Sequence, residues 1–333
     1  MSAQQTPARR PNLLALVARY REAGIGIFIL VLAVLVTLRA PAFLTVDNFR
    51  SILLNISILS IVALAQTMVI ITKGIDLSVG SIIGLVAMMV AFVFKASPDF
   101  PVIVALPLGM ALGAALGAFN GLVISYGRVP PIIATLGTLS IYRGLVFFYS
   151  QGTWINSFEL PAAFKQLSKG TPLGLPNMVI IAIVFAVVVY FFLNHTRTGR
   201  NIYAVGSNAE AAQMAGIRRQ RIIFLVYVLS GLASGLAAVL WASRFESAQT
   251  NTALGFELQT VAASVVGGVS ISGGVGTVPG VLLGALLLGA IDNSLPLLRI
   301  SPFWQLALQG LLILTAVVVD NLILRRAQRR RRR

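Results

Sequence analysis

Long apolar runs alternate with short polar breaks along almost the whole chain. A helix needs about 20 apolar residues to cross a bilayer, and runs of roughly this length recur about ten times. No polar stretch between them is long enough to form a separate soluble domain. We therefore predict an all-α integral membrane protein, a polytopic bundle of about ten transmembrane or re-entrant helices. The apolar windows are 25–40, 50–72, 77–96, 101–126, 132–149, 177–194, 221–243, 257–274, 277–298 and 303–324.

The basic residues predict the orientation of this bundle. Cytoplasmic loops of membrane proteins carry an excess of lysine and arginine. If the N-terminus lies inside, 18 of the 26 basic residues fall on the cytoplasmic side, among them the seven arginines of the final "RRAQRRRRR". We therefore predict that both termini are cytoplasmic. The expected parts are an N-terminal segment over 1–24, a transmembrane domain over 25–324 with a cytoplasmic loop over 195–220, and a basic tail over 325–333.

Composition supports lipid as the solvent of this chain. Hydrophobic residues make up 57% of it and charged residues only 11%, whereas soluble domains carry about a quarter charged residues. A net charge of +16 in a soluble protein would suggest nucleic acid, but here the charges gather at the ends of the spans. We expect them to face anionic lipid, with no nucleic-acid partner. Cysteine is absent, and no cluster of metal ligands stands out, so we predict no metal site.

Two glycine patterns predict close helix packing. The segment "LGMALGAALGAFNGL" places four glycines at intervals of four between 109 and 121, and "VGTVPGVLLGALLLGA" is similarly rich over 275–290. Small residues at this spacing let helix backbones approach each other in lipid. The run "GGVSISGGVG" over 267–276 lacks the Gly-Lys-Ser/Thr ending of a phosphate-binding loop. We therefore exclude a nucleotide site there.

The loop over 195–220 contains the most specific local signal. Ser207 and Glu210 have the spacing of a capping box that starts a short helix through "NAEAAQMA", and Gly216 is placed to end it. Two turns of helix are marginal alone, so this helix needs a surface to pack on. Its location allows an amphipathic helix lying on lipid or a docking helix for a soluble partner.

Four segments together resemble one family of transport proteins. They are "GRNIYAVGSNAEAAQMAGI", "TKGIDLSVGSIIGL", "NGLVISYGRVPPIIATLGTLSIYRGL" and "ELQTVAASVVGGVSISGGVGTVPGVLLGALLLGAIDNSL", which follow one another in family order between about 40 and 320. The chain resembles the permease subunits of bacterial carbohydrate ABC importers, in the ribose-type branch. The segments "ATLGTLSIYRGLVFFYSQGTWI" and "AIDNSLPLLRISPFWQ" look most like permeases for rhamnose and for autoinducer-2.

The resemblance implies partners and a location. It implies a cytoplasmic ABC ATPase subunit that binds ATP and Mg, a second permease copy or paralogue, a periplasmic solute-binding protein, and a multi-pass location in the bacterial inner membrane. It also implies that this chain is not an enzyme and holds no cofactor, in agreement with the lack of a Walker motif. The short helix then becomes the helix that couples to the ATPase. The residues expected in this coupling are Arg200, Gly206, Ser207, Asn208, Glu210, Ala211, Ala212, Met214, Gly216 and Ile217.

Asp76 in "TKGIDLSVGS" poses a separate question, because it stands between two strongly apolar runs. A carboxylate at mid-membrane usually marks function, whereas one at a helix start accepts hydrogen bonds from free amides. With Lys73 at the cytoplasmic edge, we predict that Asp76 caps the third span through the amide of Ser78 or Val79. Gating is a possible second role, and a substrate ligand at mid-membrane is the alternative.

Polar residues inside the spans are the other candidates for a translocation path. A buried polar group in lipid needs a partner, so each one either links helices or faces a water-filled path. Arg143 is a fixed charge inside a span, so we expect it to face the interior or to reach Asp292 or Glu159. The full set of pathway or gate candidates is Asn55, Gln66, Asp76, Ser78, Asn120, Thr135, Thr138, Tyr142, Arg143, Gln259, Thr260 and Asn293.

A second class of function is an autonomous secondary transporter or channel for a small polar solute. Such carriers place carboxylates or broken helices at ion sites near the bilayer midplane, and only Asp76 and Asp292 would serve. They have no need of the short cytoplasmic helix, which favours the importer. No dense sugar-binding constellation is present, so we expect selectivity to reside in the solute-binding protein. The outer residues Glu159 and Glu246 are candidate contacts for it.

Overall fold

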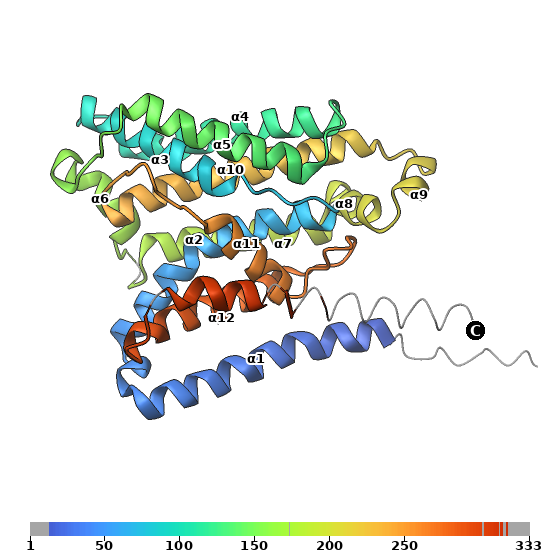
Figure 1. Cartoon of the computed structure of the whole chain (residues 1–333), viewed down its shortest axis with the longest axis horizontal. Helices are drawn as coiled ribbons and strands as arrows, with labels where there is room; N and C mark the ends of the chain where they lie inside the picture. The colour runs from blue at the N-terminus through green and yellow to red at the C-terminus, as the bar shows by residue number, and fades with distance from the viewer. Residues whose placement is uncertain (1–12, 173, 302, 313, 316–317, 319–333) are drawn as a thin grey trace, which may run out of the picture.

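The computed structural model of the chain describes residues 13–172, 174–301, 303–312, 314–315 and 318, with side chains from residue 22 onward. Within them, eight helices are long and apolar enough to cross a membrane. These helices are α1 (Leu13–Arg39), α2 (Val46–Ile71), α3 (Val79–Ala96), α4 (Val102–Ser125), α5 (Pro131–Ser150), α7 (Asn177–His195), α10 (Arg219–Phe245) and α12 (Val278–Leu297). They run roughly along one direction (Figure 1).

Shorter helices connect the long ones. They are η1 (Pro41–Leu44), η2 (Ser157–Glu159), α6 (Ala162–Lys169), α8 (Arg197–Ser207), α9 (Ala209–Met214) and α11 (Phe256–Val266). Helices α8 and α9 lie at one end of the bundle and α6 lies at the other (Figure 1). The loop over 150–176 and the loop over 195–220 therefore emerge at opposite ends of the bundle.

The all-helical fold is confirmed, and eight of the ten apolar windows correspond to long helices. The window 257–274 does not, because α11 spans only 11 residues. It begins after Gly255 and is followed by Gly268, both of which have positive φ angles that break a helix. The window 303–324 lies partly outside the described residues, as does the expected segment 1–24. The expected tail 325–333 lies wholly outside them.

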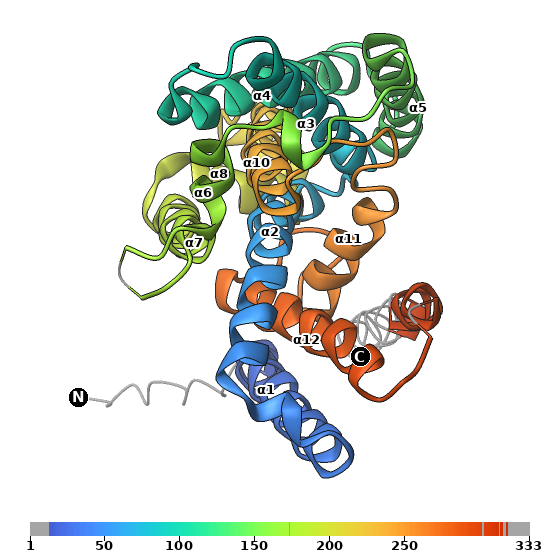
Figure 2. The ribbon, with the colours of Figure 1, turned by 90° about the vertical axis from the view of Figure 1, so that its left-hand side faces the viewer.

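Helix α2 is the central element of the bundle. Every residue of it from Ser57 to Ile71 is buried, and it packs against α10, α11, α12 and α7 (Figure 2). The outward faces of the surrounding helices are apolar and exposed, as Phe148 at 77% and Phe191 at 62% illustrate. Apolar faces of this kind suit contact with lipid.

Helices α4 and α10 pack against each other very closely. The glycines of α4 face Gly231 and Gly235 of α10, and a Cβ atom on Gly113 would lie 2.7 Å from the Gly235 Cα. Real Cβ atoms do not come that close, so the contact is backbone against backbone. The predicted glycine face is therefore confirmed, and its partner is α10.

Candidate functional site: a short capped helix and two buried polar clusters

Helix α9 is a six-residue helix that protrudes from one end of the bundle. The Oδ1 atom of Asn208 accepts hydrogen bonds from the amides of Glu210 at 3.1 Å and Ala211 at 3.0 Å. The cap is therefore Asn208, and the predicted capping box on Ser207 is wrong. Ser207 is the last residue of α8, whereas Asn208 has the extended backbone, with φ −150° and ψ 102°, that an N-cap requires.

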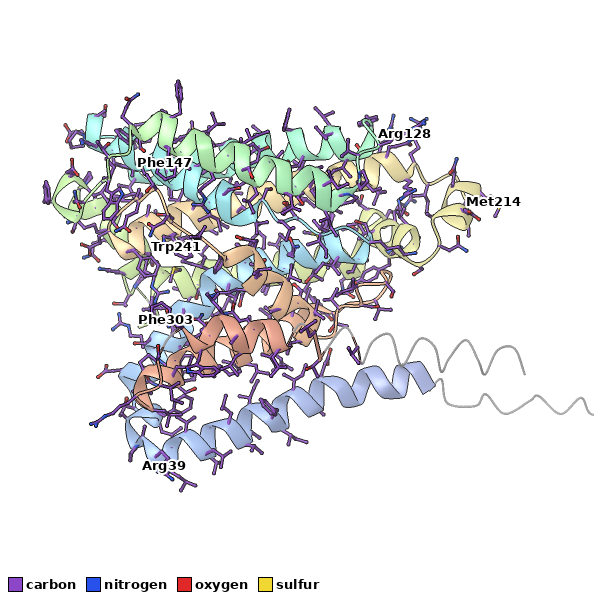
Figure 3. The ribbon with its side chains drawn as sticks, in the orientation of Figure 1. Arg39, Arg128, Phe147, Met214, Trp241 and Phe303 are labelled. Atoms are coloured by element: carbon purple, nitrogen blue, oxygen red, sulfur yellow. The ribbon has the colours of Figure 1, made fainter. Side chains whose placement is uncertain are left out.

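The other end of α9 is closed by Gly216, as predicted. Gly216 has a φ of 81°, its amide donates to the Gln213 carbonyl, and the amide of Ile217 donates to the Ala212 carbonyl. This pair of bonds is a Schellman motif. With both ends closed, α9 presents a fixed surface. Glu210 is exposed and Met214 is 85% exposed at the tip of the bundle (Figure 3).

The base of this segment is fixed to the bundle. The backbone at Gly206 lies directly against the Ile71 carbonyl and the Gly274 amide, which leaves no room for a side chain. The Tyr203 hydroxyl also donates to the Gly276 carbonyl at 2.8 Å. Of the remaining expected coupling residues, Ala212 is buried, Ile217 is half-buried, and Ala211 and Arg200 are exposed.

The first buried polar cluster surrounds Asp76, in the turn that leads into α3. Its Oδ1 atom accepts from the Ser78 amide at 3.0 Å and from the Ser78 hydroxyl at 2.6 Å. The predicted bond from the Ser78 amide is thus present. Asp76 is also fully buried, and its Oδ2 atom accepts from the Ser230 hydroxyl of α10 at 2.8 Å. The carboxylate therefore joins two helices as well as serving the helix start.

This cluster extends to two further helices. The Asn120 amide on α4 donates to the Ser78 hydroxyl at 2.8 Å, and the Tyr142 hydroxyl on α5 lies 3.4 Å from the Asn120 Oδ1 atom. Thr135 of α5 donates to the Ile75 carbonyl at 3.2 Å. Five of the predicted pathway residues thus meet around one turn.

Sequence reasoning missed Ser230 as a member of this cluster. It lies 154 residues after Asp76, within "LSGLASGLAA", and its only signal is a hydroxyl beside the glycine face of α10. The glycines let α10 approach closely enough for that hydroxyl to reach the carboxylate.

The second buried polar cluster surrounds Arg143 of α5. Its Nη1 atom donates to the backbone carbonyls of Thr250 at 3.2 Å and Thr252 at 2.8 Å. The predicted pairing with Asp292 or Glu159 is wrong. The reason is that the chain between α10 and α11 is not helical, so the carbonyls of Thr250 and Thr252 accept from a side-chain donor inside the bundle.

Glu257, at the start of α11, is the carboxylate nearest to this arrangement. Its Oε2 atom is buried and has no hydrogen-bond partner in the described part of the chain. Gly80 and Gly84 of α3 face the cluster, and a Cβ atom on Gly84 would lie 2.9 Å from the Arg143 Nη1 atom. A short helix, an unwound segment and two opposite charges therefore share one buried space.

The other pathway candidates add no side-chain bond to the side chains of these two clusters in the described part of the chain. Asn293 exchanges two hydrogen bonds with Asn48, at 2.9 and 3.0 Å, and Asn55 accepts from Arg244. Both contacts link helices. Thr138 and Thr260 each bond to a carbonyl of their own helix. Gln259 is half-buried, and the amide of the fully buried Gln66 has no partner among the described residues.

The loop over 150–176, which we expect on the outer side, is held by ion pairs. Lys95 contacts Glu159 at 2.7 Å, while Lys169 and the Ser157 hydroxyl contact Glu246. The Lys169 and Ser157 bonds hold the pKa of Glu246 below its usual value. Both acidic residues expected to meet a binding protein are thus already engaged within the chain.

Comparison with known proteins identifies the family. The family model described as "Branched-chain amino acid transport system / permease component" matches residues 48–317. The chain belongs to this permease family. The matched range includes both buried clusters, α9 and the glycine face of α4.

Curated relatives cover nearly the whole permease. The ribose import permease protein RbsC of Escherichia coli K12 is 39% identical over 89% of this chain and 92% of its own length. RbsC of Bacillus subtilis is 40% identical over 89% of this chain and 91% of its own length. The autoinducer 2 import system permease protein LsrC of Salmonella typhi is 35% identical over 96% of this chain and 91% of its own length. No solved structure matches the chain.

Family membership states the broad role of the chain. It is a multi-pass membrane permease, a component of a transport system, and not an enzyme. No group of three or more His, Cys, Asp or Glu side chains suited to a metal ion occurs in the part that the structure describes.

Proposed function

We propose that this permease carries a monosaccharide or a sugar-like signal such as autoinducer-2 into the cell, as part of an ATP-driven importer. A periplasmic solute-binding protein delivers the solute, and a separate cytoplasmic ATPase, which binds ATP and Mg, drives the cycle. The relatives named for ribose and autoinducer-2 import support the solute class.

The observation that carries the proposal is the geometry of α9. A six-residue helix is marginal alone, yet here both its ends are closed by hydrogen bonds and its base is held against the bundle. It presents the largely exposed Met214 at the tip of the bundle (Figure 3), and Glu210 is exposed as well. A protruding tip with one apolar and one acidic exposed side chain fits a groove on a soluble partner, which we assign to the ATPase.

The translocation path in this proposal runs beside α11. Non-helical backbone at membrane depth is tolerated where protein buries it or where it lines an aqueous cavity. Arg143 binds two carbonyls of the unwound segment before α11, and the buried Oε2 atom of Glu257 lies beside it without a hydrogen-bond partner among the described residues. The Asp76 cluster then transmits movement of the turn before α3 to α4, α5 and α10.

A second permease copy completes the unit in this proposal. The outward face of α5 is apolar and exposed, with Ile133 at 63% and Phe148 at 77%, and it is adjacent to Arg143 along the same helix. A copy packed on this face would place two such paths side by side. Both termini are cytoplasmic, in the inner membrane, which puts α9 on the side of the ATPase.

The competing function is an autonomous secondary transporter or channel. Its strongest support is Glu257, a buried carboxylate beside a broken helix, which is the arrangement of many ion-coupled carriers. Family membership as a permease component of a transport system favours the importer.

Uptake measurements test the proposal. Cells carrying the ATPase and binding protein of the same source receive the wild-type chain, Glu210→Arg, or Asp99→Arg. The control Asp99→Arg makes the same charge change on an exposed residue at the opposite end of the bundle. We expect labelled ribose, rhamnose or autoinducer-2 to be taken up by wild type and by the control but not by Glu210→Arg at equal protein level.

Two results would change the conclusion. Unaltered uptake in Glu210→Arg would remove the docking role of α9. Uptake that persists when the ATPase subunit is deleted would establish the secondary transporter instead.

A further inference from the structure

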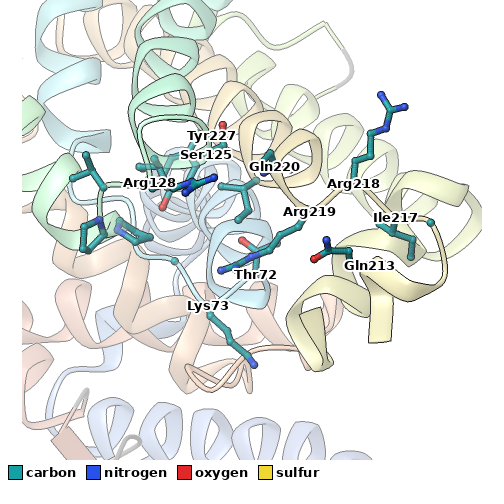
Figure 4. A pocket seen from close by; sticks show the side chains of 17 residues that line it. Thr72, Lys73, Ser125, Arg128, Gln213, Ile217, Arg218, Arg219, Gln220 and Tyr227 are labelled. Carbon is teal, nitrogen blue, oxygen red and sulfur yellow. The ribbon is translucent and has the colours of Figure 1, made fainter. Parts of the chain in front are cut away.

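A cavity of about 690 Å³ opens where three connecting segments meet (Figure 4). These segments are the turn after α2, the loop between α4 and α5, and the turn between α9 and α10. Small-molecule sites commonly have volumes of about 300–1,000 Å³, so this cavity has the size of a ligand site. No helix contact or buried cluster described above accounts for it.

Four basic residues and no acidic ones line the cavity. They are Lys73, Arg128, Arg218 and Arg219. Figure 4 shows the side chains of Arg128 and Arg219 directed into the space from opposite walls, whereas those of Lys73 and Arg218 point away from it. The ion pairs found in the described part of the chain involve none of these four.

The backbone places two of these cations at a cost. Lys73 has a φ of 67° and Arg128 a φ of 57°, values that side chains other than glycine rarely adopt. Like charges around one cavity also repel each other. Both costs would be offset by an anion bound between the cations.

A buried hydroxyl provides an independent sign of a ligand. Tyr227 lines the same cavity, is fully buried, and its hydroxyl has no hydrogen-bond partner among the described residues. The hydroxyl lies at the wall formed by Gly74, where a Cβ atom would be 2.6 Å from it. The Gly74 turn encloses this hydroxyl, so an acceptor in the cavity reaches it only when that turn moves aside; a buried donor without a partner costs about 1–3 kcal/mol, which favours this movement.

We propose that this cavity binds a phosphate-bearing anion. Arginine guanidinium groups bind phosphate oxygens through paired hydrogen bonds, and two of them converge here with a free hydroxyl donor. The volume accommodates a sugar phosphate or the headgroup of an anionic phospholipid. Both sources present the same phosphate to Arg128 and Arg219.

The walls of the cavity indicate what the anion would control. Gln213, Gly216 and Ile217 come from the coupling segment, while Thr72, Lys73 and Gly74 belong to the turn that leads to Asp76. An anion between them would hold the docking helix against the turn before α3. This regulatory consequence rests on the proposed function, whereas binding itself does not.

The test measures binding to the purified chain without any partner subunit. The chain is placed in nanodiscs of zwitterionic phosphatidylcholine, and ribose 5-phosphate is titrated by calorimetry, with uncharged ribose as the reference. A second series uses nanodiscs containing phosphatidylglycerol, which distinguishes a lipid source from a soluble one. The variant is Arg128→Gln with Arg219→Gln, and the control is Arg197→Gln with Arg221→Gln. The control removes two exposed arginines that do not line the cavity.

We expect one of the two phosphate sources to bind the wild type and the control, and to bind the cavity variant at least tenfold more weakly. Tyr227→Phe should weaken binding by about fivefold without charge change. Equal weakening in the control, or no binding of either phosphate, would overturn the proposal. If the double variant is not monodisperse, Arg219→Gln alone decides in the same way. Failure here leaves the uptake results on Glu210→Arg unaffected, so the two proposals are tested separately.

Discussion

The carboxylate of Asp76 and the hydroxyl of Ser230 are joined by a 2.8 Å hydrogen bond across 154 residues of sequence. This bond connects the turn before α3 to the middle of α10. Both residues are fully buried, so no water replaces the bond when it is lost. It therefore ties to α10 a turn that Thr135 of α5 and Asn120 of α4 also hold.

Removing this bond should destabilise the fold. Hydrogen bonds to carboxylates contribute about 1.5–3 kcal/mol, and we expect Ser230→Ala to lower the free energy of unfolding in detergent by about that amount. Asp76→Ala should cost more, because it also leaves the Ser78 hydroxyl and amide without their acceptor. The double variant should be less than additive. Ser234→Ala is the control, since its hydroxyl bonds only within α10. Additive effects would show that the bond is not formed.

Side chains should not be tolerated on the glycine face of α4. Gly113→Ala would place a Cβ atom 2.7 Å from Gly235 and separate α4 from α10. We expect a loss of at least about 3 kcal/mol or no folded protein, measured by size-exclusion chromatography and thermal unfolding. Gly137→Ala on α5 is the matched control, because nothing lies within 4 Å of its Cβ position. Normal folding of Gly113→Ala would contradict the packing.

The cap of α9 can be tested by exchange of neighbouring residues. Asn208→Ala should destabilise α9 by about 1 kcal/mol, whereas Asn208→Asp should retain its hydrogen bonds. Ser207→Ala should leave the start of α9 unchanged, because Ser207 ends the preceding helix. Hydrogen exchange of the Glu210 and Ala211 amides is the measurement. Faster exchange in Ser207→Ala but not in Asn208→Ala would restore the capping box predicted from sequence.

Arg143 should be required for the segment before α11. Arg143→Leu removes the donor to the Thr250 and Thr252 carbonyls, each bond contributing about 1.5–3 kcal/mol. We expect increased protease or label access at 250–255 and impaired uptake. Arg143→Lys should restore one bond and part of the activity. Wild-type uptake by Arg143→Leu would exclude a role in the path.

The outer loop should loosen in acid. The pKa of Glu246 is lowered by Lys169 and Ser157, so this cluster stabilises the loop above the unfolded pKa of the carboxyl group. The contribution disappears as the pH falls through the lowered pKa of the folded state. We expect proteolysis at 157–169 to rise over that acidic range, and Lys169→Met to raise it at neutral pH as well. A pH-independent cleavage rate in the wild type would show that the pairs do not hold the loop.

The sequence predicts most of the architecture because lipid imposes a simple rule. Long apolar runs must become helices, so seven windows match their helices within a few residues, although α1 begins 12 residues before its window. The glycine face of α4 could likewise be predicted before its partner was known. The exception at 257–274 is instructive. Hydropathy shows that this window is apolar but not whether it is helical throughout. The glycines at the two ends of α11 limit the helix to 11 residues.

Contacts between residues that lie far apart in the chain could not be predicted from the sequence. The Ser78 amide bond to Asp76 is local and could be predicted from helix capping, whereas its bond to Ser230 depends on how closely α10 approaches. Arg143 was rightly expected to face inward, yet its acceptors are backbone carbonyls, which have no signature in the residue letters. The cap of α9 was misplaced by one residue, because Ser207 and Asn208 are both good caps and only the backbone angle distinguishes them.

The backbone contact between α4 and α10 has a consequence for any cycle of opening and closing. Two helices whose backbones touch have no side chains between them that could rearrange, so they must move together as one rigid unit. Probes on these two helices would report a constant separation throughout the cycle and serve as an internal ruler. Any change in the distance from this rigid pair of helices to α9 or α11 would then report movement of α9 or α11 alone.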